Sequence, residues 1–173
     1  MSERRSPRPF WRIVWDLFDY PVVYDNSSWL LVIKDEFSGK LFVFPLPSKE
    51  GAQVFETTRN FEHWVKRQYN LSICKMKHDQ EKAVIAIRGN TAYERWCAEE
   101  GIELELSPSH THEPNGGSER AGQEVINKAL AMRLSAGLPE ELWPETMLAI
   151  TYLYNISLLY SYRWSSPNEV LDS

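Results

Sequence analysis

The run WRIVWDLF, residues 11–18, is apolar and rich in strand-forming side chains, and it contains one carboxylate, Asp16. Such a composition predicts a β-strand. A carboxylate in the middle of an apolar strand is costly to bury unless a cation or hydrogen bonds compensate for the lost water. Asp16 is therefore either an acid that points to solvent near a strand end or a carboxylate held by a cation.

Two further apolar runs follow, WLLVI at residues 29–33 and LFVF at residues 41–44. Turn-forming residues from Asp35 to Gly39 separate them, so these two runs predict a hairpin. Three strands therefore come first in the chain. The later predicted elements are helices over 48–69, 90–100, 118–136 and 140–160 and strands over 71–77 and 102–106.

The order of these elements, β-β-β-α-β-α-β-α-α, predicts the fold class. A hairpin followed by strand–helix–strand crossovers is typical of a mixed α/β architecture. We therefore expect a five-stranded mixed sheet flanked by helices on both faces. The first and fourth strands are expected to be neighbours, which would bring Asp16 close to Asp79 at the end of the fourth.

Composition indicates one folded domain. The chain has 173 residues, of which 43% are hydrophobic and 13% aromatic, and its net charge of −5 disfavours a large, uniform nucleic-acid-binding surface. Residues 1–9 carry Arg4, Arg5 and Arg8 and are expected to form a flexible basic tail before a domain over 10–173. We expect no signal peptide and no transmembrane segment. Two separated cysteines indicate reduced thiols in an intracellular protein and no structural zinc site.

Two more acids occupy positions that suit a site. Asp79 follows the fourth predicted strand, where α/β sheets place their ligands, and Glu119 lies in the first turn of a predicted helix. Each has an ordinary alternative: Asp79 as a surface acid, and Glu119 as a charge stabilised by the helix dipole. Three converging carboxylates would suit Mg²⁺ or Mn²⁺. Two such ions about 4 Å apart can activate a nucleophile and stabilise a phosphodiester leaving oxygen.

Several ordered segments identify a family resemblance. SPSHTHEPNGGSER at residues 107–120 is followed by LPEELWPETMLAITYLYN at 138–155 and by SPNE at 166–169. At the front, Asp16-Leu-Phe with Pro21 precedes the hairpin over 31–45. From about residue 10 to residue 171, the chain resembles the integrase catalytic core of copia-type retrotransposons, a branch of the retroviral integrase superfamily with an RNase H-like fold.

The resemblance implies a metal-dependent polynucleotidyl transferase that processes the 3′ ends of element DNA and transfers them into target DNA. It implies that Asp16, Asp79 and Glu119 are the catalytic residues and the ligands of Mg²⁺ or Mn²⁺. It further implies an endonuclease and nucleotidyltransferase that works in the nucleus after a stage in a cytoplasmic particle, and that pairs as a homodimer or joins a larger integrase assembly. The residues implied to contact DNA are Asn115, Gly116, Arg120, Gln123 and Lys128.

The chain also departs from the family pattern. Asp79 is followed by Gln-Glu-Lys-Ala83 where the family has Asn-Gly and an acidic–aromatic pair, and residues 83–90 form an extra stretch. This departure favours an alternative, a catalytically inactive or domesticated integrase fold that serves nucleic-acid binding or dimerisation. A third possibility is a nuclease of the RNase H type, which requires a fourth carboxylate on the first long helix. Glu56 and Glu62 are the candidates.

Overall fold

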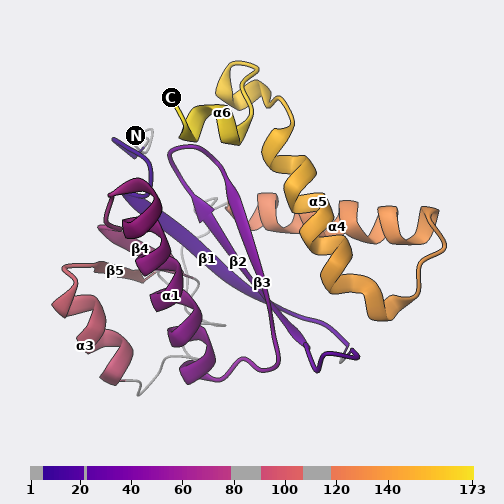
Figure 1. Ribbon diagram of the computed structural model, residues 1–173, viewed down its shortest axis with the longest axis horizontal. Coiled ribbons are helices and arrows are strands. Elements are labelled where there is room, and N and C mark those ends of the chain that lie inside the picture. Colours follow the sequence, from indigo (N-terminus) through magenta and orange to yellow (C-terminus); the bar gives the residue numbers. More distant parts are fainter. Residues whose placement is uncertain (1–5, 22, 79–90, 107–117) are drawn as a thin grey trace.

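A five-stranded mixed sheet with helices on both faces forms the domain, as the sequence predicts (Figure 1). The computed structural model describes residues 6–21, 23–78, 91–106 and 118–173. The strands are β1 (Arg12–Asp19), β2 (Trp29–Asp35), β3 (Leu41–Leu46), β4 (Lys75–His78) and β5 (Glu103–Leu106), and the helices are α1 (Gly51–Tyr69), α3 (Thr91–Glu99), α4 (Ser118–Ser135), α5 (Trp143–Ile156) and α6 (Pro167–Leu171).

The strand order is β3-β2-β1-β4-β5. β1, β2 and β3 pair antiparallel, whereas β4 and β5 continue the sheet parallel to β1. The hairpin between β2 and β3 turns through Asp35, whose buried carboxylate accepts hydrogen bonds from Ser38 N and Ser38 Oγ at 3.0 and 2.7 Å. Gly39 has a φ of +73° in this turn, a conformation that glycine adopts without strain.

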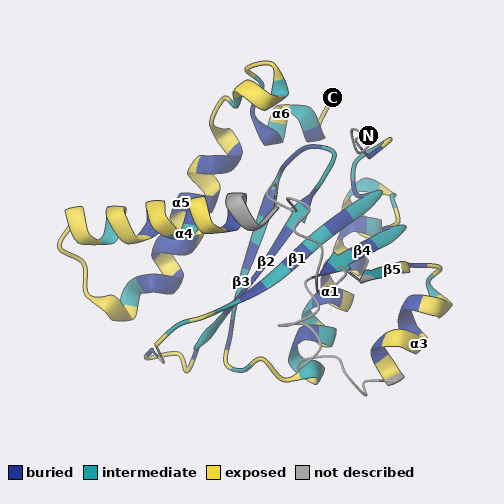
Figure 2. Cartoon of the chain, turned by 180° about the vertical axis from the view of Figure 1, so that it is seen from behind, coloured by how far each residue is buried: buried dark blue, intermediate teal, exposed yellow. Residues whose placement is uncertain are grey.

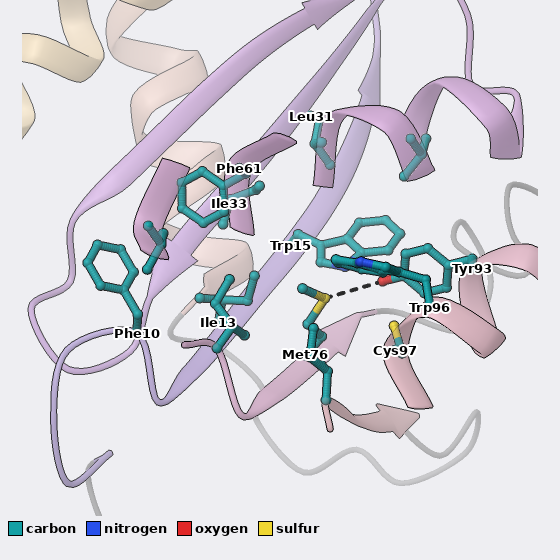
Figure 3. Packing of buried hydrophobic residues seen from close by; sticks show 14 of the residues in the cluster. Phe10, Ile13, Trp15, Leu31, Ile33, Phe61, Met76, Tyr93, Trp96 and Cys97 are labelled. Atoms are coloured by element: carbon teal, nitrogen blue, oxygen red, sulfur yellow. Dashed lines mark hydrogen bonds between the residues drawn. The ribbon is translucent and has the colours of Figure 1, made fainter. Parts of the chain in front are cut away.

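Each face of the sheet has its own hydrophobic core. On one face Trp15 and Met76 pack with aromatic residues of α1 and α3, and Tyr93 Oη lies 3.4 Å from Met76 Sδ (Figure 3). On the other face Leu30 and Val32 pack with buried residues of α4 and α5. Figure 2 shows this burial as a dark stripe along the helices that cover the sheet. The α1–α3 face is richer in large aromatic side chains than the α4–α5 face.

Three predicted elements have different bounds in the structure. β4 spans four residues, shorter than the strand predicted over 71–77, because the chain from 71 to 74 has no strand structure although Ile73 is buried. The helix predicted over 140–160 is a short 3₁₀ turn followed by α5, which ends at Ile156. The first long helix begins at Gly51, and Ser48 lies before it, accepting a hydrogen bond from Glu50 N.

The front of the chain is attached to the domain from residue 6 onward. Ser6 is buried and donates to Glu36, and Arg8 donates to the backbone oxygen of Ser72 at 3.0 Å. The Arg8 guanidinium also lies 5.2 Å from the centre of the Trp11 ring. Residues 6–9, which we expected to belong to a flexible tail, therefore make specific contacts. Residues 1–5, with Arg4 and Arg5, lie outside the described part of the chain.

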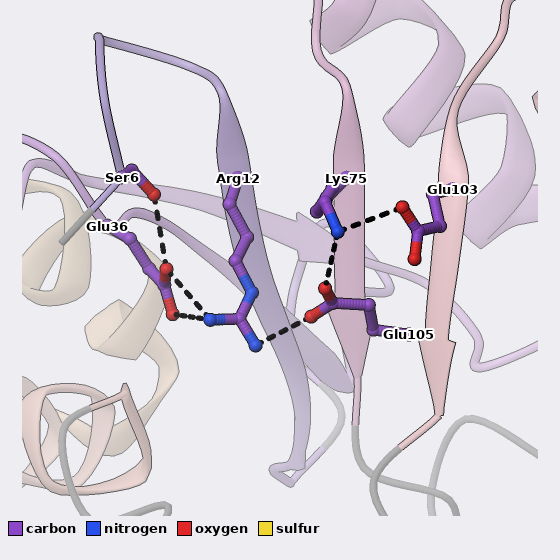
Figure 4. Close-up of polar contacts among 6 residues, drawn as sticks. All are labelled: Ser6, Arg12, Glu36, Lys75, Glu103 and Glu105. Atoms are coloured by element: carbon purple, nitrogen blue, oxygen red, sulfur yellow. Dashed lines mark hydrogen bonds and ion pairs between the residues drawn. The ribbon is translucent and has the colours of Figure 1, made fainter. Parts of the chain in front are cut away.

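Ion pairs connect the strands at the amino ends of the parallel part of the sheet (Figure 4). Arg12 on β1 pairs with Glu36 at 3.2 Å and with Glu105 on β5 at 2.6 Å. Lys75 on β4 pairs with Glu103 and Glu105. These basic side chains are thus neutralised within the sheet. They contribute to strand registry and do not form a basic strip for nucleic acid.

Candidate functional site

Asp16 lies on the α4–α5 face of β1. Side chains alternate along a strand, and Ile13, Trp15 and Leu17 are buried in the α1–α3 core. Asp16 and Phe18 therefore point to the opposite face. Asp16 is half-buried, and its Oδ1 accepts a hydrogen bond from Leu17 N at 2.8 Å. Asp16 lies in the interior of a central strand and is only partly exposed. This position favours a carboxylate held by a cation over an acid that points to solvent near a strand end.

The register between β1 and β4 places the end of β4 beside the part of β1 that carries Asp16. The two strands run parallel, and the last residues that pair between them are Trp15 and His78. Asp16 is the next residue on β1, and Asp79 is the residue that follows β4 in the sequence. Asp79 itself lies outside the described residues, so its side chain is not placed. The pairing nevertheless confirms that the first and fourth strands are neighbours and that β4 ends beside Asp16.

His78 belongs to the other face of the sheet. Its ring is 3% exposed and lies 4.8 Å from the Trp15 ring at an interplanar angle of 36°. Because residues paired across neighbouring strands point to the same face, His78 and Trp15 both enter the α1–α3 core. His78 therefore packs against Trp15 and does not share the sheet face of Asp16.

α4 begins over the same face of β1 that carries Asp16. Its first turn contains residues 118–121, so the backbone of Glu119 and Arg120 is helical, as predicted, but their side chains lie outside the described set. Gly122 follows in the second turn and packs against the Phe18 ring. α4 thus contacts β1 two residues after Asp16. Asn115 and Gly116 lie outside the described residues.

The two predicted DNA-binding residues that are described lie on the exposed face of α4. Gln123 Nε2 donates a hydrogen bond to Asn127 Oδ1 at 3.1 Å, and Lys128 Nζ pairs with Glu124. The Lys128 side chain is 53% exposed. With a rise of about 1.5 Å per residue, Lys128 lies roughly 14 Å along the helix from Glu119. That spacing places Lys128 outside any metal site that Glu119 would join.

The loop after β1 is fastened to the start of α5. Tyr20 stacks on Trp143 with ring centres 4.5 Å apart, and Trp143 Nε1 donates to the Pro21 backbone oxygen at 3.1 Å. Burial raises the pKa of Tyr20 to about 12. Tyr24 further along the loop donates to Glu145. A groove of about 90 Å³ opens between Tyr20, Trp143 and α4, but its walls are mainly apolar.

Comparison with known proteins identifies the kind of domain. The chain is 27% identical over 155 residues to the retrovirus-related Pol polyprotein from transposon RE1 of Arabidopsis thaliana, and 26% identical over 145 residues to that from transposon TNT 1-94 of Nicotiana tabacum. These matches cover 89% and 84% of the chain. The fold matches the catalytic core domain of BIV integrase with a TM-score of 0.65, at 15% identity and with 93% of each chain covered. The domain therefore has the fold of a retroviral integrase catalytic core.

Other solved structures agree with this assignment. The HTLV-2 integrase catalytic core, solved in complex with magnesium in a trimeric form, matches with a TM-score of 0.67 at 16% identity, covering 96% of this chain and 99% of that one. A chain of the simian T-cell lymphotropic virus intasome, solved in complex with the PP2A regulatory subunit B56 gamma, matches with a TM-score of 0.73 at 14% identity, covering 98% of this chain and 57% of that one. The comparisons therefore confirm the RNase H-like fold and the copia-type resemblance.

The chain spans about 10% of the length of the curated Pol polyproteins that it matches. No protein-family model matches it. Among the described residues, no helix combines the length and apolarity that crossing a membrane requires. Within that same part of the chain, no three His, Cys, Asp or Glu side chains gather closely enough to hold a metal ion. Asp79 and the Glu119 side chain are not in that part.

Glu62, one candidate for a fourth carboxylate, lies at the opposite end of the sheet. It is fully buried on α1 and pairs with Lys66 at 3.2 Å, and Lys66 also pairs with Glu100, just before β5 begins. Asp16 follows the last parallel pair of β1 with β4, at the carboxyl end of β4, whereas β5 begins at the amino ends of the parallel strands. Glu62 is therefore separated from Asp16, which does not favour it as the fourth carboxylate of an RNase H nuclease. Glu56 is exposed on α1.

Sequence reasoning missed two residues that organise the site's surroundings. Gly122 allows the close contact between α4 and β1, and its signal is a glycine inside an otherwise regular helix. Asn155 exchanges two hydrogen bonds with the backbone of Leu41 and so attaches α5 to β3. Its signal is a lone amide in the most apolar helix of the chain. Neither signal names the contacting partner, which only the tertiary structure supplies.

Proposed function

We propose that the domain is a metal-dependent polynucleotidyl transferase that processes DNA 3′ ends and joins them to target DNA. The observation that carries this proposal is the parallel pairing of Trp15 with His78. Asp16 is the next residue on β1, and Asp79 is the residue that follows β4 in the sequence. The first turn of α4, with Glu119, begins over the same sheet face. The relationship to retrotransposon Pol polyproteins supports the same activity.

The donor set fits Mg²⁺ or Mn²⁺. Asp16, Asp79 and Glu119 offer carboxylate oxygens, which these cations prefer. His78, which directly precedes Asp79, is packed in the opposite core and so does not face this site. The similar HTLV-2 core was solved with magnesium. When bound, such ions would activate the attacking oxygen and stabilise the charge on the leaving oxygen.

The protein's own residues would position the reactants. Asp16 is held by a central strand with a partner on each side, which restricts its movement. Gln123 and Lys128 would contact the DNA backbone from the exposed face of α4, together with Arg120 and the residues Asn115 and Gly116 that precede the helix. Lys128 would have to exchange its pairing with Glu124 for a phosphate. No covalent link between protein and DNA is required, since the attacking group is a water or a DNA 3′-hydroxyl.

Metal-dependent stabilisation tests the proposal. Ligand that binds only the folded state stabilises by RT ln(1 + [L]/Kd), about 2.7 kcal/mol at 100 Kd. For a chain of this size that predicts a melting temperature about 5–11 °C higher in excess Mn²⁺. Asp79→Asn should abolish most of the increase while leaving the metal-free protein equally or more stable, because it removes repulsion between carboxylates. The matched control is Glu99→Gln, which removes an exposed charge on α3 and should preserve the shift.

The opposite result has a definite meaning. A wild-type chain whose melting temperature does not respond to about 10 mM Mn²⁺, a concentration well above the Kd of a functional site, would refute the catalytic proposal. The inactive integrase fold, kept for nucleic-acid binding or dimerisation, would then be the better description.

DNA contact is tested separately. Lys128→Ala should weaken binding of a duplex oligonucleotide and lower the slope of log K against log salt by about 0.9, as expected when one phosphate contact is lost. Arg67→Ala removes a positive charge from α1, on the other face of the sheet, and should leave the slope unchanged. Equal slopes for Lys128→Ala and the wild type would remove Lys128 from the proposed interface.

We also propose that the domain pairs through α5. Two apolar segments, 90–100 and 140–160, are rich enough in aromatic residues to form such an interface, but Tyr93 and Trp96 of the first segment are buried in the chain's own core. Leu148, Tyr152 and Ile156 of α5 recur every four residues and are 51%, 64% and 45% exposed. A two-fold interface would cover such a stripe. In the cell, we propose a cytoplasmic particle stage followed by action in the nucleus.

A further inference from the structure

Gly122 is a glycine in the interior of a helix, where it has a cost. A glycine there destabilises by about 1 kcal/mol relative to alanine. The described glycines with positive φ are Gly39, Gly101 and Gly137, and Gly122 is not among them. Its backbone is therefore one that any residue adopts in a helix. The reason for glycine at this position must be the absence of a side chain.

The space that a side chain would need is occupied by Phe18. A Cβ on Gly122 would lie 3.2 Å from Cζ and 3.4 Å from Cε2 of the Phe18 ring. Favourable carbon–carbon contacts are about 3.5–4.0 Å long, so either the ring or the helix would have to move by a few tenths of an ångström. The ring packs against the core of the α4–α5 face, and Val125 and Ala129 bury the same side of α4. Gly122 thus sets how closely the start of α4 approaches β1.

This contact adjoins the predicted acids on both elements. Phe18 follows Asp16 by two residues on β1 and points to the same face, because side chains alternate along a strand. Gly122 follows Glu119 by three residues on α4, which is slightly less than one helical turn. A change in the separation of Phe18 and Gly122 therefore changes the separation of Asp16 from the helical turn that carries Glu119.

We propose that Gly122 is a positioning residue, which holds the first turn of α4 at the distance from Asp16 that divalent metal binding requires. The proposal rests on the proposed function, since it concerns the geometry of that metal site. Oxygen ligands must meet a small cation at about 2.0–2.2 Å, so a shift of a few tenths of an ångström is a large error. Changes in the residues that support metal ligands reduce affinity by about 10-fold to 100-fold.

The test uses the whole chain and Mn²⁺ alone as the probe, followed by electron paramagnetic resonance of the free ion. Gly122→Ala should weaken Mn²⁺ binding by about 10-fold. Its urea stability should stay close to that of the wild type, because the better helix propensity of alanine opposes the crowding against Phe18. Phe18→Leu removes the two ring atoms that crowd the new methyl group, so Phe18→Leu combined with Gly122→Ala should restore most of the affinity. The control Asn127→Ala, on the exposed face of α4, should leave the Mn²⁺ affinity unchanged.

A second perturbation approaches from the strand. Phe18→Tyr adds an oxygen at Cζ, the ring atom nearest to Gly122. It should displace the start of α4 and so weaken Mn²⁺ binding, although the sequence of α4 is unchanged. This variant keeps the test decisive if Gly122→Ala fails to fold. Wild-type affinity in the folded members of this pair would overturn the positioning role, and so would a loss of affinity in Gly122→Ala that Phe18→Leu does not restore. A wild-type chain that binds no Mn²⁺ refutes the proposed function, and the positioning role with it.

Discussion

Asn155→Asp should destabilise the domain at neutral pH and recover stability in acid. The Asn155 side chain is 7% exposed, its Nδ2 donates to the Leu41 backbone oxygen at 2.8 Å, and its Oδ1 accepts from Leu41 N at 2.9 Å. Leu41 lies on β3, an edge strand, and is 1% exposed. The amide therefore satisfies a donor and an acceptor that have no further strand to pair with.

The magnitude follows from the two bonds. A buried backbone group left without a partner costs about 1–3 kcal/mol, so Asn155→Ala should lose about 2–4 kcal/mol with some access for water. An ionised aspartate keeps the bond from Leu41 N but places a negative oxygen against the Leu41 carbonyl. Its loss at pH 7 should be at least as large, equivalent to a melting temperature about 4–16 °C lower.

The pH dependence distinguishes this mechanism from simple loss of packing. Protonated aspartate can donate to the Leu41 oxygen and so rebuild both bonds, which raises its folded pKa above the unfolded value of about 3.9. For an acid with a raised pKa, stability is fully present below the unfolded pKa and is lost as pH rises through the folded pKa. Asn155→Asp should therefore approach the wild type near pH 4 and fall behind it by pH 7, whereas Asn155→Ala should stay behind throughout.

Urea unfolding followed by tryptophan fluorescence between pH 4 and pH 8 measures both effects. The control Asn60→Asp, at an exposed position of α1, should stay within about 0.5 kcal/mol of the wild type. Equal stability of Asn155→Asp and the wild type at pH 7 would refute the reasoning. A deficit that does not change with pH would refute the proposed hydrogen-bond exchange.

Three further predictions concern other elements. Burial raises the pKa of Glu62, a cost that Lys66 only partly offsets, so wild-type stability should fall as pH rises from about 4.5 through the folded pKa, while Glu62→Gln should flatten that fall in thermal melts. Hydrogen bonds from the backbone and the side chain of Ser166 lower the pKa of Glu169, so the cap of α6 should weaken only as pH drops through that lowered value; Glu169→Gln should remove this acid sensitivity in hydrogen exchange of α6. Tyr152→Lys should leave the melting temperature of the monomer unchanged but prevent pairing in sedimentation at high micromolar concentration; a wild-type chain that is already monomeric there would contradict the dimer.

Local sequence patterns determined the elements and their order. The alternation and apolarity of residues 11–18, 29–33 and 41–44 predicted the first three strands, and the turn after Asp35 predicted the hairpin. These features depend on side-chain periodicity and backbone conformation, which are properties of neighbouring residues. The Ser166-Pro-Asn-Glu169 segment is also local, and the structure shows it as a reciprocal helix cap. The family resemblance added the prediction that Asp16, Asp79 and Glu119 form one site, which no pattern of periodicity could single out.

The tertiary structure alone decided which residues meet. The face of each residue in β4 follows from its register with β1, and that register, which no local pattern specifies, placed His78 in the α1–α3 core. The same holds for Gly122 against Phe18, Asn155 against Leu41, and Tyr20 against Trp143. Each pair joins residues at least 100 positions apart in sequence, apart from the strand register. Such contacts depend on how whole elements pack, because a side chain's neighbours across a core are set by sheet order and helix placement and not by the residues beside it in the chain.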